Sequence, residues 1–190
     1  MLTRKEFHEA LQRMVIALRQ SNSVDAAAAL DLVLNQGDAE MKAQALFYQG
    51  LSSAEKGVFE EADRSWSNAL QYARDGSFLR FELELNFAGA SERQAKPEEA
   101  IDWVKKALET GCCGDEFAGV KALTAYLRLN DGKIKPEDQA VFACVCEKCW
   151  RVLEIPGEPD SDDWVATSKR LADELENRAT AIINATDEVL

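Results

Sequence analysis

The stretch ALFYQGLSSAEKGVFEEADRSWSNALQY, residues 45–72, predicts two helices joined by a tight turn. Gly57 suits the end of the first helix, because a residue without Cβ tolerates a left-handed backbone. Gly50 in the first helix permits the second helix to approach closely. In the second helix, Ala62 and Trp66 are four residues apart on one face, where the indole can fill the space toward the next helix. The stretch therefore predicts an antiparallel helical hairpin.

The hairpin pattern recurs along the chain. Residues 83–108, LELNFAGASERQAKPEEAIDWVKKAL, place Ala100 where the first copy has Ala62, a step of 38 residues. A weaker copy upstream places Ala27 35 residues before Ala62, with Leu34 at the second small-residue position. The shared motif reads Ala62-x3-Trp66-x2-Ala69 in one copy and Ala100-x3-Val104-x2-Ala107 in the next. Internal repeats of this length indicate a solenoid of helix pairs, and an irregular helical bundle is the alternative.

This pattern resembles the tetratricopeptide repeat, whose step is about 34 residues and whose motif ends in A-x3-F-x2-A. The resemblance covers residues 1–112 and is strong over 44–110, although the steps are longer and Leu46 stands where the family commonly has Trp. It implies an all-α, tetratricopeptide-like antiparallel helix-hairpin solenoid that binds a segment of another protein in a concave groove. By the family's register, the groove positions are Gln12, Ile16, Gln44, Phe47, Tyr48, Leu51, Glu82, Leu85, Asn86 and Gly89.

The same register argues against one mode of binding within the family. Co-chaperones built on this repeat bind a C-terminal carboxylate through Lys, Asn and Arg side chains. The corresponding positions here include Ile16, Tyr48 and Glu82, and Glu82 would repel a terminal carboxylate. The resemblance therefore implies an amphipathic helix or a basic extended segment as the ligand.

Capping and breaking residues divide the chain into about nine helices. Residues 1–155 are expected to form about four helix pairs, and residues 156–190 a linker and a C-terminal capping helix of the same domain. The expected start signals are a Thr3–Glu6 capping box, Ser23, Pro97, Asp115, Pro136 and Ser161, and the expected breaks are Gly37–Asp38, Gly76, Gly111, Asn130–Gly132 and Pro156–Pro159.

The charge of the chain narrows its partners. With 34 acidic and 22 basic residues, the formal net charge is −12. Such a surface repels phosphate backbones, so we expect no nucleic-acid partner, and it favours encounter with a basic protein. No apolar stretch is long enough to span a membrane, and charges interrupt the N-terminal residues as they would not in a signal peptide. Five cysteines, an odd number, suit reduced thiols in the cytoplasm.

The cysteine-rich stretch Cys144-Val145-Cys146-Glu147-Lys148-Cys149, with Cys112-Cys113 upstream, raises the possibility of a zinc site. At 100° per residue, Cys144 points about 160° from Cys146 and about 140° from Cys149, so an unbroken helix cannot make the three thiols converge. We expect core packing instead, with Cys149 continuing a stripe of Val141, Val145 and Val152. His8 is the only histidine, and no catalytic motif is present. We therefore expect no metal, cofactor or enzymatic activity.

Three functions remain open at the level of sequence. The first is a general protein–protein interaction module that uses the groove. The second is a dedicated acidic neutraliser or chaperone of a basic partner, such as a toxin immunity protein, an antitoxin or a secretion chaperone. The third is a thiol or zinc-binding protein that uses the cysteine-rich stretch.

Overall fold

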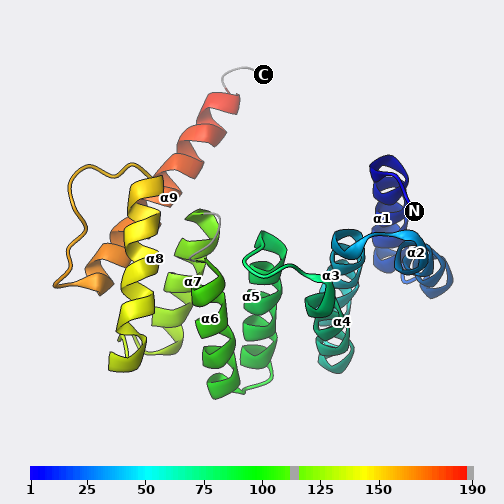
Figure 1. The fold of residues 1–190 in the computed structure, drawn as a ribbon, viewed down its shortest axis with the longest axis horizontal. Helices are drawn as coiled ribbons and strands as arrows, with labels where there is room; N and C mark the ends of the chain where they lie inside the picture. Colours follow the sequence, from blue (N-terminus) through cyan, green and yellow to red (C-terminus); the bar gives the residue numbers. More distant parts are fainter. Residues whose placement is uncertain (112–115, 188–190) are drawn as a thin grey trace.

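The computed structural model describes residues 1–111 and 116–187, which form helices and connecting segments without any strand. The nine α-helices of this part of the chain are α1 (Arg4–Arg19), α2 (Ser23–Gln36), α3 (Ala39–Glu55), α4 (Phe59–Tyr72), α5 (Phe78–Arg93), α6 (Pro97–Gly111), α7 (Glu116–Leu129), α8 (Gln139–Val152) and α9 (Trp164–Asp187). Consecutive helices pack as antiparallel hairpins, and the hairpins follow one another in a row from α1 to α9 (Figure 1). The predicted all-α helix-hairpin solenoid is confirmed.

The helices of the row form two layers. Each odd-numbered helix packs against the next odd-numbered helix, from α1 through α9. Among the even-numbered helices of the described chain, only α6 and α8 pack on each other to a similar extent. A row whose members are closer together on one side bends toward that side, so we infer that α1, α3, α5 and α7 line the concave face.

The core is divided into three successive clusters rather than gathered in one place. The first joins α1, α2 and the start of α3, the second joins α3, α4 and α5, and the third extends from α5 to α9. Tyr48 packs against the first and second clusters, and Trp103 against the second and third. The Trp103 ring stacks on Phe87 with centroids 4.2 Å apart. Stability therefore depends on contacts between neighbouring hairpins, as expected of a repeat array.

The hairpin of α3 and α4 is joined as its sequence predicts. Trp66 is fully buried and donates its indole N–H to the carbonyl oxygen of Phe47 at 3.2 Å. A Cβ on Gly50 would lie 2.2 Å from the indole nitrogen, so only glycine permits this approach. The indole also meets Phe87 of α5 edge to face at 5.4 Å. Gly57 ends the turn with φ of 76°. Trp66 thus connects its own hairpin to the next.

Most of the expected helix signals are confirmed, and three are wrong by a few residues. The capping box of Thr3 and Glu6 is present, and Pro97 begins α6. Asn22, not Ser23, caps α2, because its side chain accepts the N–H of Asp25 while Ser23 is already helical. Asp163, not Ser161, accepts the N–H of Ala166 at the start of α9, at 2.9 Å. Pro136 opens a short 3-10 turn, Pro136–Asp138, and α8 begins after it. The predicted cap Asp115 lies outside the described residues.

The register of the weakest repeat copy also needs correction. Ala26 and Val33 are buried in α2, whereas Ala27 is exposed and Leu34 is half-buried. The true equivalent of Ala62 is therefore Ala26. Both are the fourth residue of their helices, and so is the buried Ala100 of α6.

The last helices close the row through a buried polar contact and an apolar seam. Tyr126 of α7 donates its hydroxyl to Asp138 at 2.6 Å, and the Lys105 ammonium lies 2.9 Å from the same carboxylate oxygen. Burial, followed by the hydrogen bond to Asp138, raises the pKa of Tyr126 to about 12. α9 buries Trp164 and Leu171 while packing on both α7 and α8, which is the role expected of a capping helix. The side chains of residues 181–190 lie outside the described part.

Candidate functional site

A cleft of about 780 Å³ lies where α3 and α5 run side by side on the concave face. One wall is the first half of α3, and the other is the α4–α5 connector with the first turns of α5. We call it the α3–α5 cleft. The side chains that give it chemical character are Glu40, Gln44, Phe47, Tyr48, Tyr72, Arg74, Phe78 and Glu82.

Helix starts determine which side chains reach this cleft. Asp38 caps α3 by accepting the N–H of Met41 at 2.9 Å, which places Glu40, Gln44 and Tyr48 on one face at four-residue spacing. Ser77 caps α5 by accepting the N–H of Arg80 at 3.2 Å. Phe78 is therefore the first residue of α5, and Glu82 follows it one turn later on the same face.

Aromatic rings dominate the apolar surface of the cleft. Phe78 is 51% exposed and Tyr72 is 39% exposed, although both are large apolar side chains. Tyr48 is half-buried and meets the buried Phe47 edge to face at 5.6 Å. Exposed aromatic rings beside a hollow are typical of surfaces that bind another molecule, because their burial there is favourable.

The charged groups of the cleft are only partly paired. The lining carries the carboxylates of Glu40 and Glu82 and the guanidinium of Arg74. The Lys121 ammonium of α7 is 3.7 Å from Oε1 of Glu82, beyond hydrogen-bonding distance. Within the described residues no N–H or O–H donates to that oxygen, although it is buried. The cleft thus combines aromatic surface with a carboxylate that lacks a donor.

Comparison with family models, curated proteins and solved structures gives no match to this chain. The assignment of the cleft consequently depends on its own geometry. Over the described part of the chain, no helix has both the length and the apolar character that a bilayer-spanning segment needs.

Four of the eight groove positions predicted from the repeat register meet in this cleft, namely Gln44, Phe47, Tyr48 and Glu82. The other four lie elsewhere. Leu51 is half-buried against the second core cluster, and Asn86 turns its amide back to the Glu82 carbonyl oxygen at 2.8 Å. Gln12 is exposed on α1. Ile16, 54% exposed, lines a separate hollow of about 340 Å³ between α1 and α2.

The sequence analysis did not identify Glu40, Tyr72, Arg74 or Phe78 as site residues. Glu40 lies one turn before Gln44, so the same helical face would have included it. Phe78 could have been found from Ser77, whose role as a helix cap leaves the following aromatic residue in the exposed first turn. Tyr72 and Arg74 lie at and beyond the end of α4, and no repeat position points to them.

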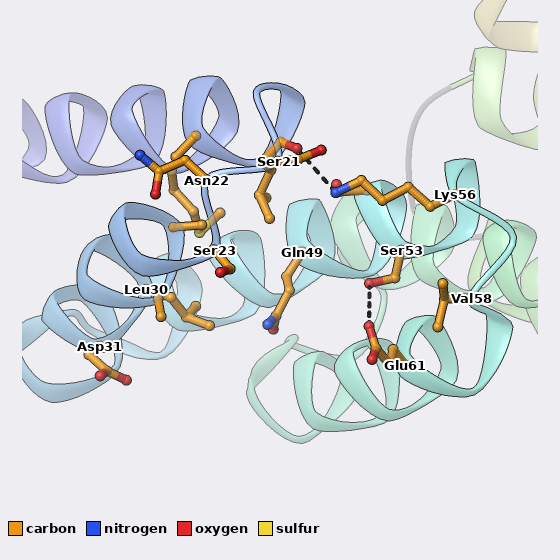
Figure 2. A pocket seen from close by; sticks show the side chains of 16 residues that line it. Ser21, Asn22, Ser23, Leu30, Asp31, Gln49, Ser53, Lys56, Val58 and Glu61 are labelled. Carbon is orange, nitrogen blue, oxygen red and sulfur yellow. Dashed lines mark hydrogen bonds between the residues drawn. The ribbon is translucent and has the colours of Figure 1, made fainter.

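A second hollow, of about 300 Å³, separates the α1–α2 hairpin from the α3–α4 hairpin (Figure 2). Lys56, at the end of α3, extends to the end of α1 and donates to the Leu18 carbonyl oxygen at 3.1 Å. Ser53 lies 3.5 Å from Glu61 across the neighbouring turn. These polar groups use their hydrogen bonds to join the two hairpins, so we regard the hollow as a structural joint.

The cysteine-rich stretch forms part of α8, as expected, but only part of it faces the core. Cys146 and Cys149 are buried, and a Cβ on Gly119 of α7 would lie 2.6 Å from the Cys149 sulfur. Cys144 and Val152 are exposed, so the predicted stripe ends at Cys149. Burial raises the pKa of the Cys146 thiol, which lowers its reactivity. No three His, Cys, Asp or Glu side chains within the described residues are arranged to hold a metal ion. Cys112 and Cys113 lie outside those residues.

Proposed function

We propose that this chain is a non-enzymatic, tetratricopeptide-like interaction module that holds a segment of a partner protein in the α3–α5 cleft. The observation that carries the proposal is the exposure of Phe78 and Tyr72 at a preformed hollow on the concave side. Aromatic side chains are enriched among the residues that contribute most to protein–protein binding, because they bury a large area at a small entropic cost. A preformed cleft adds little ordering cost on binding.

A dedicated acidic neutraliser or chaperone is the second candidate, and the net charge of −12 favours it. An acidic surface speeds encounter with a basic toxin or secreted protein and repels acidic competitors. This candidate uses the same cleft but requires a single partner, whereas a general module accepts several. Reduced thiols and the repeat resemblance agree with action in the cytoplasm.

Comparative capture tests the proposed function. Tagged wild-type protein, Phe78→Ala and Val152→Ala are incubated with lysate of the source cells, and the retained proteins are quantified by mass spectrometry. Val152 is the control, because it is 47% exposed on α8 and lies away from the cleft. We expect at least one protein that wild type and Val152→Ala retain equally and that Phe78→Ala loses. Retention of the same proteins in the same amounts by all three forms would refute the proposal.

A further inference from the structure

The α3–α5 cleft contains a carboxylate whose surroundings leave it without a donor. The Glu82 side chain lines the cleft and is 22% exposed, so most of its surface has been removed from water. Its Oε1 is buried, and among the described residues nothing donates a hydrogen bond to it. A buried acceptor that lacks a partner is unfavourable, and a ligand that supplies an N–H corrects this. The missing group is therefore a donor, preferably a cationic one.

The rest of the lining favours a cation with an apolar, flat shape. Glu40 contributes a second carboxylate against the single guanidinium of Arg74 among the described lining residues, so the lining has a net charge of −1. Tyr72 and Phe78 offer exposed ring faces beside these carboxylates. The Lys42 ammonium already lies 5.7 Å from the centre of the Tyr72 ring, which shows that a cation can approach this ring in the folded chain.

We propose that the cleft recognises an arginine side chain of the partner protein, with the guanidinium paired to Glu82 and stacked on Tyr72 or Phe78. This inference rests on the proposed function and names the chemistry of its ligand. Arginine fits better than lysine, because a planar guanidinium can stack on a ring and donate to a carboxylate at the same time. An ammonium acts as a point charge and is more strongly hydrated. The net charge of −12 attracts such a segment from a distance.

The test uses isolated side-chain analogues, so it does not require the partner. The full chain, labelled with ¹⁵N, is titrated with N-acetyl-arginine-N-methylamide and with the matched citrulline compound, which keeps the shape but removes the charge. We expect binding on the order of 10 mM for the arginine compound and at least about fivefold weaker binding for citrulline. The shifted resonances should belong to residues 40–48 and 72–82.

Two carboxylate variants make the test specific for Glu82. Glu82→Gln should weaken arginine binding at least about threefold, which is the loss of one charge-assisted contact in a solvated cleft. Glu55→Gln removes the same charge from an exposed position at the end of α3 and should leave binding within experimental error. A thermal melt of each variant checks that the fold is retained.

Equal binding of arginine and citrulline, shifts outside the cleft, absence of shifts, or full binding by Glu82→Gln would each overturn the arginine inference. These outcomes are separate from failure of the proposed function. If Phe78→Ala still loses a captured protein while arginine shows no preference, the interaction module stands and only the identity of its ligand group is wrong.

Discussion

Replacement of Gly50 by Ala tests the packing that joins α3 to α4. An added Cβ would lie 2.2 Å from the indole nitrogen of Trp66 and 2.4 Å from its Cδ1, far inside van der Waals contact. The atoms on the other side are ring carbons of a fully buried side chain that also touches Phe87, so they have little room to move. Withdrawal of the indole would also break its hydrogen bond to the Phe47 carbonyl oxygen.

The magnitude follows from three opposing effects. Overpacking of a core costs about 1–3 kcal/mol, and a buried indole N–H that loses its acceptor costs about 1–3 kcal/mol more. The replacement of Gly by Ala in a helix stabilises by about 1 kcal/mol, which offsets only part of this cost. We expect a net loss of about 3 kcal/mol, and a fall in the melting temperature of about 5–10 °C for a chain of this size.

Gly89 of α5 provides the matched control, since a Cβ there has no atom within 4 Å. Gly89→Ala should keep or raise the melting temperature, because only the helix propensity changes. Both variants are compared by circular dichroism melts. In addition, Trp66→Ala alone should cost about 3 kcal/mol or more, and Gly50→Ala should cost nothing further in that background. A Gly50→Ala protein that melts at or above wild type would show that Trp66 does not fill the space beside Gly50.

Three further predictions concern the cleft, the thiols and a buried carboxylate. Tyr48→Ala should weaken binding of a captured partner by at least about 1 kcal/mol without unfolding, as titration calorimetry and a melt can show. Cys146→Ala should lower stability by about 1–2 kcal/mol because Cys146 is buried, while Cys144→Ala should change it by less than about 0.5 kcal/mol; loss of partner binding with an unchanged melt would contradict this. Burial alone would raise the pKa of Asp138, but hydrogen bonds, that from Tyr126 above all, lower it below its ordinary value. The stabilisation from Asp138 is thus fully present above about pH 4 and is lost as the pH falls through the lowered pKa, so Asp138→Asn should be less stable at neutral pH and lose less stability on acidification in urea titrations.

Local chemistry made much of the fold predictable from the sequence. Gly50, Trp66 and Ala62 have roles that follow from size alone, and the capping box at Thr3 follows from side-chain reach. The errors occurred where two adjacent residues have similar chemistry. Asn22 and Ser23 can both cap a helix, and the run of alanines at 26–29 offers several small residues for one buried position. In such cases the packing of the neighbouring helix decides, and a local pattern does not contain it.

The candidate site was less predictable, because it arises between repeats rather than within one. The repeat register identifies positions on the first helix of each pair, and it placed Gln44, Tyr48 and Glu82 correctly on the facing sides of α3 and α5. It assumes that all joints along the concave face are alike. Hollows form where neighbouring helices separate, so residues such as Asn86 with the expected register need not line one.

The cleft coincides with the place where the repeat length departs most from its usual value. The connector between α2 and α3 is residues 37–38, whereas the connector between α4 and α5 is residues 73–77, three residues longer. α5 is one residue shorter than α3, so the step from Ala62 to Ala100 is 38 residues while that from Ala26 to Ala62 is 36. The longer connector supplies Arg74 and separates Tyr72 from Phe78, so that both rings end beside the hollow rather than within the helical seam. The irregular spacing that weakens the family resemblance is thus what provides this joint with its aromatic surface.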